Sequence, residues 1–525
     1  MKNLIFLVSS LISILSSAQT NTFPLSHKFF DANEINFLKK DINTSFRPVI
    51  FSKKDSLENL LRKKYYKVNS FKYSNFNYQN ENYAFLISPL INLSYSISKK
   101  ESFSNNSRGL MIKGSIGNKL SFKSFFLENQ SFFPTFLDSI VRSVPISGVE
   151  IVPGQGEARI FKENGYDYSR SEGFFSYKIN NNIIIQFGHG KHFIGNGYRS
   201  LILSDNSYPY PFLRLQTSLG IFRYTNLFTE FMDIRNNQLS IIKGFDSWSR
   251  KYMSLHFLEC NLTKKLKLGI FESVVYAENH APGVSSIDLN YLNPIIFYRP
   301  VEYSLRSPDN VLLGIDLKYR TNMSQFLYAQ FILDEFTLSE IKSNSGYWAN
   351  KYGYQIGYKF LNFLNIIGLN TNFEYNLVRP YTYSHWNSSS YGHYAQPLAH
   401  PLGANFDESV IKIDYTFNRL GFNIKYNYAR VGLDDTQNDS ISYGSDIFLN
   451  YNLRSDDYGI QQFNGIKASI KNFKFHISYL IDYKNNLKIG FFISNRSFVY
   501  KGYENNETYS GIYIKTDLFN YYYDR

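Results

Sequence analysis

The chain has 525 residues, of which 43% are hydrophobic and 18% aromatic, with 47 phenylalanines, 44 tyrosines and a single cysteine, Cys260. This composition excludes an intrinsically disordered chain and a scaffold held by disulfides. The formal net charge is +13, but lysines and arginines stand singly rather than in blocks. We interpret them as solvated charges of loops and turns. We expect no nucleic-acid partner, whereas acidic glycans and lipid headgroups stay open as partners.

A secretory signal peptide is predicted at the start of the chain. Lys2 precedes an apolar run from Leu4 to Leu15, and Ser16-Ser17-Ala18 supplies small residues for cleavage by signal peptidase. The next residue is Gln19, where a lipid anchor would need a cysteine. We therefore expect a signal peptide over residues 1–18 and an exported, unlipidated mature chain.

Residues 19–85 lack the pattern of the remaining chain. Asp31–Lys40 and Asp55–Lys64 combine dense charge with helical spacing, and Asp55 with Glu58 three residues later is typical of a helix start. We expect a short, partly helical periplasmic segment here. A simple connector is the alternative.

Residues 86–525 are dominated by alternation of apolar and polar residues. In Lys351–Phe360, for example, tyrosines, Ile356 and Phe360 fall on one face and lysines, glycines and Gln355 on the other. No run of about 18 apolar residues follows the signal peptide, so helical membrane spans are not expected. Alternating segments of about ten residues predict an all-β protein, a transmembrane antiparallel β-barrel that pairs every backbone group internally.

A soluble β-sandwich would alternate too, so connections and residue types decide between the two. Tyrosines are abundant at the ends of the apolar rows, as in the aromatic girdles of outer-membrane barrels. Short turns such as Asn418-Arg419 alternate with long connections such as Ala277–Asp309 and Val378–Glu408. About nineteen strand segments can be counted, but a bacterial barrel needs an even number, so we expect 16–20. The weakest assignments are Phe212–Leu219 as a strand and Ser445–Asn452 as a loop.

Catalytic and metal-binding signatures are missing from the sequence. The sequence contains no G-x-S-x-G, H-E-x-x-H or Walker pattern. His189 and His192 lie close in sequence without a helpful carboxylate, and Asp434, Asp435 and Asp439 lack the glycine and glutamate of a Ca²⁺ loop. We expect loop residues in both places, and therefore no enzyme, no metal and no cofactor.

Two long connections carry residues suited to sugar recognition. One contains Arg299, Glu302 and Arg306 beside two prolines, and the other begins Arg379-Pro380-Tyr381 and continues through His385 and Trp386. Aromatic faces can stack on sugar rings, and guanidinium groups can bind hydroxyls and carboxylates. We predict a shared glycan-binding patch at the extracellular end of the barrel. The alternative is a folded lid whose polar groups satisfy one another.

Several motifs resemble one protein family. They are Ser45-Phe46-Arg47-Pro48, Gly195–Asp205, Asn293-Pro294, Arg299-Pro300-Val301-Glu302, Arg379-Pro380-Tyr381 through Pro401-Leu402-Gly403, Tyr443–Ile447 and Asp457-Tyr458-Gly459. The chain resembles the Bacteroidota gliding-motility proteins of the RemB type, which are similar to the capsule-assembly Wzi family. The resemblance implies an 18-stranded outer-membrane barrel, partly filled by non-barrel elements, that acts in surface polysaccharide attachment or gliding.

The leading hypothesis is a non-enzymatic outer-membrane barrel that binds or anchors an acidic surface polysaccharide, with envelope motility proteins as further partners. Three alternatives stay open. A diffusion channel predicts an unobstructed polar lumen, and a barrel-borne hydrolase predicts a catalytic geometry at one rim. A structural component of a motility or secretion complex predicts envelope partners without glycan affinity.

Overall fold

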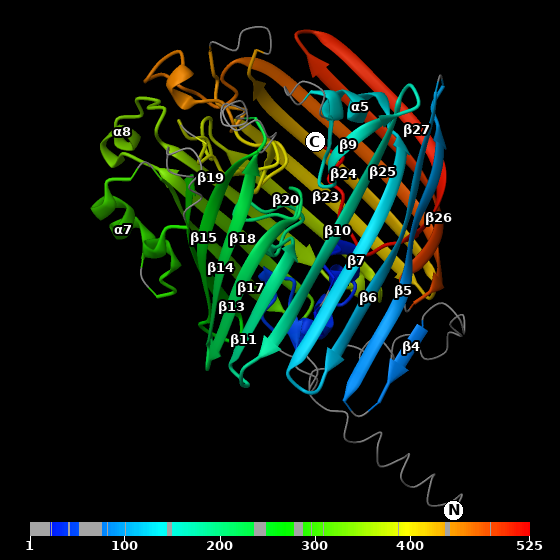
Figure 1. The fold of residues 1–525 in the computed structure, drawn as a ribbon. Coiled ribbons are helices and arrows are strands. Elements are labelled where there is room, and N and C mark those ends of the chain that lie inside the picture. Colours follow the sequence, from blue (N-terminus) through cyan, green and yellow to red (C-terminus); the bar gives the residue numbers. More distant parts are fainter. Residues whose placement is uncertain are drawn as a thin grey trace, which may run out of the picture.

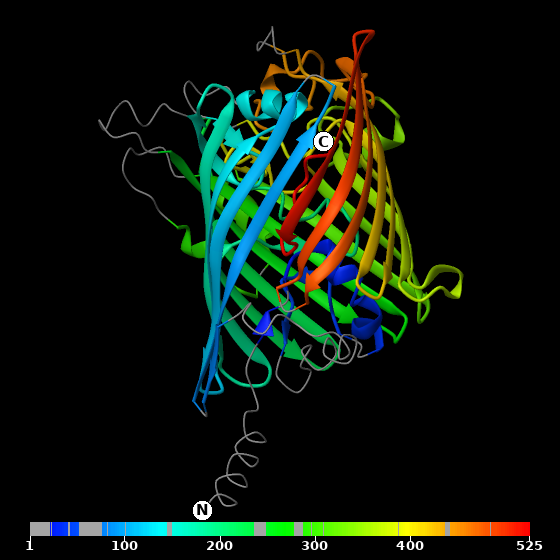
Figure 2. The same cartoon turned by 90° about the vertical axis from the view of Figure 1, so that its right-hand side faces the viewer.

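The structure is a computed structural model in which the chain forms one β-barrel with several segments inside it (Figures 1 and 2). It describes residues 21–22, 24–39, 42–51, 76–80, 82–99, 101–143, 150–235, 248–277, 287–295, 297–307, 309–386, 388–435, 441–483 and 485–525. The predicted signal peptide and the predicted helix Asp55–Lys64 lie outside these residues. None of the helices in the described ranges is long and apolar enough to cross a membrane.

Eighteen antiparallel strands close the barrel within the described residues. They are β5 (Tyr83–Ile97), β6 (Ser102–Ile116), β7 (Leu120–Phe132), β10 (Gly165–Lys178), β11 (Ile183–Gly190), β13 (Tyr210–Leu219), β14 (Phe222–Asp233), β15 (Ser249–Asn261), β16 (Leu266–Ala277), β17 (Asn310–Asn322), β18 (Gln325–Glu335), β19 (Lys351–Phe360), β20 (Leu369–Val378), β23 (Phe406–Phe417), β24 (Leu420–Leu433), β25 (Ile466–Asp482), β26 (Leu487–Tyr500) and β27 (Tyr503–Thr516). The all-β barrel predicted from alternation is confirmed, and its strand number equals that implied by the family resemblance.

The remaining elements are short. The strands are β1 (Asn21–Thr22), β2 (Phe46–Arg47), β3 (Ile50–Phe51), β4 (Phe76–Gln79), β8 (Glu150–Val152), β9 (Gly156–Phe161), β12 (Phe193–Ile194), β21 (Gly392–His393) and β22 (Gln396–Pro397). The helices are α2 (His27–Asp31), α3 (Glu34–Lys39), α5 (Thr135–Arg142), η2 (Leu289–Leu292), α7 (Tyr298–Leu305), α8 (Leu338–Lys342), η3 (Phe363–Asn365) and η4 (Tyr451–Leu453).

The barrel closes where its last strand pairs with its first. β27 and β5 run antiparallel, with Ser510 opposite Ile97 and Lys515 opposite Asn92. Every other barrel strand pairs with the strand next to it in the wall, which leaves each wall strand with a neighbour on both sides. Closure removes the free edges that would otherwise leave backbone amides and carbonyls unpaired.

Alternation along the strands separates an apolar outer face from a polar inner face. On β19 the outward Ile356 is 55% exposed, whereas the inward Lys351, Gln355 and Lys359 are buried against material in the lumen. The same arrangement recurs on β17, where Ile315 faces outward and Asp316 inward. Period-two alternation in the sequence therefore predicts the two faces correctly.

The two ends of the barrel differ in the length of their connections. Short turns join the strands at one end, which we call the turn end and which lies at the bottom of Figure 1. At the opposite end, the loop end, most connections are long, as between β20 and β23 or between β24 and β25, whereas β5–β6 and β26–β27 are joined there by short turns. The weakly patterned segment Phe212–Leu219 is a strand, β13, and Ser445–Asn452 stays in a loop apart from η4.

Four segments fill the lumen, and we call them together the plug. They are residues 24–51, 191–209, 379–405 and 517–525, as far as the structure describes them. The largest buried cluster joins plug residues such as Phe46, Leu201 and Tyr383 to inward residues of the wall such as Phe257 and Val378. Figure 2 shows the blue N-terminal segment inside the lower part of the barrel.

The described residues of 24–51 include the helices α2 and α3 and lie inside the barrel, whereas β4 pairs with β5 in the wall. Asp31 accepts hydrogen bonds from Lys359 on β19 and Lys412 on β23, both at 2.9 Å. Glu34 accepts from Lys318 on β17 at 3.1 Å. The acidic residues of this stretch therefore form ion pairs with lysines that point inward from the wall. The first of the eighteen wall strands, β5, begins at Tyr83.

Candidate functional site

A buried charge network holds the plug to the wall. Arg199 donates to Glu408 of β23 at 2.6 and 2.9 Å, and to Asp524 in the C-terminal tail at 3.2 Å. Lys425 of β24 donates to the same Asp524 at 2.5 Å, and His400 contacts Glu408 at 2.8 Å. Burial opposes ionisation of Asp524, but the charges of Arg199 and Lys425 outweigh it and hold its pKa well below the ordinary value. The tail is therefore fixed as an anion inside the barrel.

Several of the motifs that carry the family resemblance contact one another in or next to this plug. Gly195 donates its backbone N–H to Ser45, and Arg47 donates to the carbonyl of Gly195 at 3.2 Å. Tyr381 donates its backbone N–H to the carbonyl of Gly444 at 2.9 Å. Segments that are far apart in the sequence thus contact one another inside the barrel, which gives these motifs a structural role.

An aromatic cluster lies at the loop end, and we call it the rim cluster. It comprises Tyr347, Trp348, Lys351, Tyr381, His385, Trp386, Tyr451, Arg454 and Tyr458. Three long connections contribute to it: those between β18 and β19, between β20 and β23, and between β24 and β25. No single stretch of sequence contains the cluster, because each connection supplies only part of it.

Ring contacts define the geometry of the rim cluster. The rings of Trp348 and Tyr451 are 4.7 Å apart between centroids, and the Arg454 guanidinium lies 4.1 Å from the Trp348 centroid. Tyr347 and Tyr458 are 5.4 Å apart. Trp348 is buried, but Tyr458 is 55% exposed. The cluster therefore has a packed base and an outer part that offers aromatic surface.

Of the predicted glycan-binding residues, Arg379 and Tyr381 are structural parts of this base. Arg379 donates to the carbonyls of Asn350 at 2.9 Å and Ile460 at 3.4 Å. Tyr381 is fully buried, and its hydroxyl donates to the carbonyl of Ser442 at 2.8 Å. These two side chains hold three connections together, which corresponds to the folded lid that the sequence left open as an alternative.

His385 and Trp386 lie beside each other, with ring centroids 6.1 Å apart. His385 is buried and contacts Tyr451 at 5.6 Å, whereas Trp386 is 40% exposed. Trp386 is thus the member of the predicted set that presents an aromatic face at the rim.

Arg299, Glu302 and Arg306 lie elsewhere. They belong to α7 and its C-terminal cap, which Figure 1 shows outside the barrel wall. Arg299 donates to Glu302 at 2.9 Å, and both Arg299 and Arg306 are exposed. The structure brings Arg379, Tyr381, His385 and Trp386 together in one region, but α7 is on the outer side of the wall. The two loops therefore do not form the single patch that we expected.

The α7 segment covers an unusual polar strip on the outer wall. Asn226, His256 and Glu272 are paired across β14, β15 and β16 and point outward. Glu272 accepts the backbone N–H groups of Tyr298 at 2.9 Å and Arg299 at 3.0 Å, while the Tyr298 ring lies 4.1 Å from that of His256. Outward polar groups are costly where lipid surrounds a barrel, and this segment shields them.

Two residues considered as metal ligands, His192 and Asp434, make other contacts in the structure. His192 is buried, with its Nδ1 at 3.3 Å from the Tyr210 hydroxyl, and burial lowers its pKa well below the ordinary value. Asp434 accepts backbone N–H groups of Tyr443, Ser445 and Asp446 and thereby shapes its loop. Asp439 lies outside the described residues. No group of three or more metal-ligating side chains occurs in the part of the chain that the structure describes.

Trp348, Tyr451, Arg454 and Tyr458 were not among the predicted site residues. Asp457-Tyr458-Gly459 was noticed as a motif, and the structure explains it: Trp348 donates its backbone N–H to Asp457, and Gly459 donates to Ser345. Aromatic residues are so abundant in this chain that their presence in a loop carries little information. Only the contact between loops distinguishes these side chains.

Comparison with known proteins yields structural likeness only. No protein-family model matches the chain, and no curated protein matches it. Wzi, an outer membrane protein involved in group 1 capsule assembly in Escherichia coli and a carbohydrate-binding β-barrel, is similar with a TM-score of 0.55 and 12% identity over 94% of this chain and 99% of Wzi.

Two other barrels have lower TM-scores. OprD from Pseudomonas aeruginosa has a TM-score of 0.42 and 10% identity over 83% of this chain and 94% of OprD. OccAB2 from Acinetobacter baumannii has a TM-score of 0.43 and 10% identity over 83% of this chain and 98% of OccAB2. The likeness to Wzi shows a common fold. It agrees with the Wzi-like barrel that the sequence motifs imply, whereas no match points to a protein of the RemB type.

Proposed function

We propose that this chain is a non-enzymatic outer-membrane barrel that binds surface polysaccharide at its loop end and so helps to attach or assemble a capsule or exopolysaccharide. The observation that carries the proposal is the rim cluster, in which exposed Trp386 and Tyr458 stand on a packed base of Trp348, Tyr451 and Arg454. Rigid aromatic faces are suited to sugar rings because they stack on C–H surfaces without much loss of conformational entropy.

Placement in the outer membrane is supported by the wall itself. Its outer face exposes aliphatic and aromatic side chains on many strands, among them Leu110, Phe187, Ile270, Ile315 and Ile356. A closed barrel with such a face satisfies its backbone internally and can be surrounded by lipid. With the N-terminal segment at the turn end, the loop end is the extracellular one, as in barrels whose short turns face the periplasm.

The filled lumen favours surface binding over diffusion. The network around Arg199 and the ion pairs of Asp31 and Glu34 join the plug to inward side chains of the wall on several strands. A porin-like channel needs a continuous polar passage, and the plug occupies part of the lumen where such a passage would run. A role in gliding motility, with envelope motility proteins as partners, stays a prediction that rests on the sequence motifs alone.

The chemistry of the rim cluster favours stacking over charge. Its cations already have partners: Arg454 donates to Asp457 at 2.6 Å, and Lys351 donates to Glu335 at 3.0 Å. The net charge of +13 attracts an acidic polymer at long range, but contacts at the rim depend mainly on the aromatic faces. Salt should therefore reduce the association rate more than it weakens the final complex.

The test is binding of the detergent-purified protein to polysaccharide isolated from the surface of its own cells. Wild type is compared with Trp386→Ala and Tyr458→Ala at low and high salt. We expect each substitution to weaken binding by about 5–30-fold, since stacked aromatic contacts contribute about 1–2 kcal/mol each. Tyr303→Ala, which removes an exposed tyrosine of α7 on the outer wall, is the matched control. Equal binding by all four proteins would reject the proposal.

A further inference from the structure

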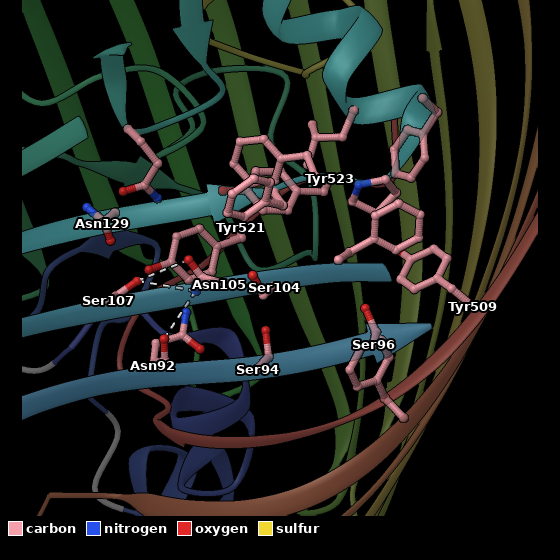
Figure 3. A pocket seen from close by; sticks show the side chains of 18 of the residues that line it. Asn92, Ser94, Ser96, Ser104, Asn105, Ser107, Asn129, Tyr509, Tyr521 and Tyr523 are labelled. Atoms are coloured by element: carbon pink, nitrogen blue, oxygen red, sulfur yellow. Dashed lines mark hydrogen bonds between the residues drawn. The ribbon is translucent and has the colours of Figure 1, made fainter. Parts of the chain in front are cut away.

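The lumen contains a cavity that the plug leaves open. It has a volume of about 180 Å³ and lies between β5, β6 and β7, the C-terminal tail and α5 (Figure 3). One enclosed water needs roughly 10–15 Å³ on the same measure, so the cavity has room for a small molecule together with water. It is separate from the rim cluster, since the two share no lining residue.

One side of the cavity is a row of amides and hydroxyls. Asn92, Ser94 and Ser96 point inward from β5, and Asn105 and Ser107 point inward from the neighbouring β6. The Asn105 amide donates to the carbonyl of Asn92 at 3.3 Å and to the Ser107 hydroxyl at 3.2 Å, which fixes its orientation. The hydroxyls of Ser94 and Ser96 make no hydrogen bond to any other residue that the structure describes, so they are available to a ligand.

The opposite side is aromatic. Tyr521 and Tyr523 extend from the C-terminal tail toward the row of serines and asparagines, as Figure 3 shows. Their rings are 5.6 Å apart, and Phe133 lies 6.1 Å from Tyr523 and 6.3 Å from Tyr168. The tail is held by the Asp524 contacts described above, so these rings are positioned by the plug and not by the wall.

The lining is uncharged. Serine, asparagine, glutamine, tyrosine, phenylalanine, leucine and proline surround the cavity, and no acidic or basic side chain is among the described residues that line it. Gln155, which is 2% exposed, belongs to the lining, and within the described residues neither its Oε1 nor its Nε2 has a well-formed hydrogen bond. The side chains of Tyr521 and Tyr523 interact with this amide. A buried amide whose hydrogen bonds are incomplete can bond a neutral polar guest.

Helix α5 forms the roof. Phe136 and Leu137 line the cavity, and the first backbone N–H groups of the helix, at Thr135 and Phe136, donate to the carboxylate of Glu507 on β27 at 3.1 and 3.4 Å. Arg496 of β26 lies 4.7 Å from the Phe136 ring. The roof is thus attached to the wall at the side of β26 and β27.

From this arrangement we infer that the cavity is a binding site for one neutral sugar residue, such as a hexose. A pyranose ring has an apolar C–H face and a rim of hydroxyls, which match the tyrosine side and the serine and asparagine side respectively. An anionic sugar would find no cation in the lining, and a lipid chain would leave the amides and hydroxyls without partners. The inference rests on this cavity alone and does not depend on the proposed function of the rim cluster.

The experiment is saturation-transfer-difference NMR on the full-length protein in detergent with D-glucose, D-galactose and D-mannose as probes. We expect at least one of them to bind with a Kd on the order of 1 mM, typical of a single small ligand. Ser94→Leu places a bulky side chain into the cavity and should abolish the signal, while the double variant Ser94→Ala with Ser96→Ala should weaken binding about tenfold. Ser88→Ala removes another buried, inward hydroxyl of β5 that is not part of the cavity and should leave binding unchanged.

Absence of binding by wild type to all three sugars would overturn the inference, as would equal binding by wild type and Ser94→Leu. Tyr523→Leu provides a second route should the serine variants assemble poorly: it should weaken binding by about fivefold or more through loss of stacking. Heat-modifiable mobility of each variant in gels reports whether the barrel has formed. Polysaccharide binding at the rim cluster should persist in Ser94→Leu, which distinguishes failure of this inference from failure of the proposed function.

Discussion

Arg199 donates a hydrogen bond to Asp524 across 3.2 Å, and both side chains are buried inside the barrel. The contact joins a segment that follows β11 to the penultimate residue of the chain. The chain therefore does not end with its last wall strand, because residues 517–525 turn back into the lumen and become part of the plug. Two structural features depend on this tail: part of the plug in the lumen and the aromatic side of the cavity.

Removal of the Asp524 carboxylate should destabilise the protein strongly. Asp524→Ala leaves Lys425 without its carboxylate and Arg199 with only Glu408, and breaking a buried ion pair from one side costs about 3–5 kcal/mol. Denaturant unfolding in detergent micelles, followed by tryptophan fluorescence, measures the change. Glu302→Ala breaks the partly exposed pair with Arg299 and should cost about 1 kcal/mol or less. Equal effects of the two substitutions would contradict the importance of the tail.

The filled lumen predicts that the wild-type protein does not conduct ions. Reconstitution into planar lipid bilayers should give no steady conductance steps, because plug and wall are joined by ion pairs around the lumen. Truncation after Thr516 removes the tail and its contacts to Arg199 and Lys425, so it should produce open events that wild type lacks. Stable porin-like steps from the wild-type protein would instead favour a diffusion channel.

A pH dependence is expected from His393. Met232 donates its backbone N–H to Nδ1 of this buried residue at 2.9 Å, and Nε2 lies 3.3 Å from the carbonyl of Pro209, so the neutral ring fits the site. Burial lowers its pKa to about 3. Because the folded-state pKa lies below the unfolded value of about 6.5, the stabilisation is complete above pH 6.5 and is lost as the pH falls toward 3.

Protonation of His393 in the unfolded state should lower the free energy of unfolding by about 2 kcal/mol between pH 7.5 and pH 5. His393→Gln keeps one donor and one acceptor but does not titrate, so its stability should change less over this interval. The midpoint of thermal unfolding at the two pH values measures both proteins. The same shift in wild type and variant would show that His393 is not responsible.

Gly444 should be needed for the packing of the rim cluster. It has a φ of +81°, and an added Cβ would lie 2.5 Å from the backbone nitrogen of Tyr381, which contacts Trp348. Gly444→Ala should therefore displace Tyr381 and weaken polysaccharide binding about tenfold without preventing barrel assembly. Gly459→Ala is the matched control, because Gly459 has a similar φ of +74° but empty space around its Cβ position. Equal loss in both variants would mean that backbone strain, and not the contact with Tyr381, matters.

Alternation of apolar and polar residues in the sequence predicts the strands of the wall but not the segments that fill the lumen. On β19 the tyrosines and Ile356 face outward and Lys351, Gln355 and Lys359 inward, as their spacing indicates, because side chains of a strand alternate whatever lies around it. The plug has no such period. Its segments are defined by contacts over hundreds of residues, such as Arg199 with Asp524, and nothing in local spacing predicts them.

The candidate site was predicted only in part for a related reason. Both Trp386 and Arg379 are predicted from the sequence to meet the glycan; in the structure Trp386 is exposed, whereas Arg379 donates to backbone carbonyls. Arg299 was assigned to the same patch because both loops leave the same end of the barrel, but its segment folds down the outside to cover Glu272. Loop direction depends on tertiary packing, which residue types alone do not determine.

The most direct test of the central claim is retention of polysaccharide at the cell surface. Cells that lack this protein are complemented with wild type, with the double variant Trp386→Ala and Tyr458→Ala, or with Tyr303→Ala, and insertion of each protein into the outer membrane is checked first. Wild type and Tyr303→Ala should keep the polysaccharide on the cells, whereas the double variant should release it into the medium as the uncomplemented cells do. Full retention by a correctly inserted double variant would contradict a glycan-binding rim.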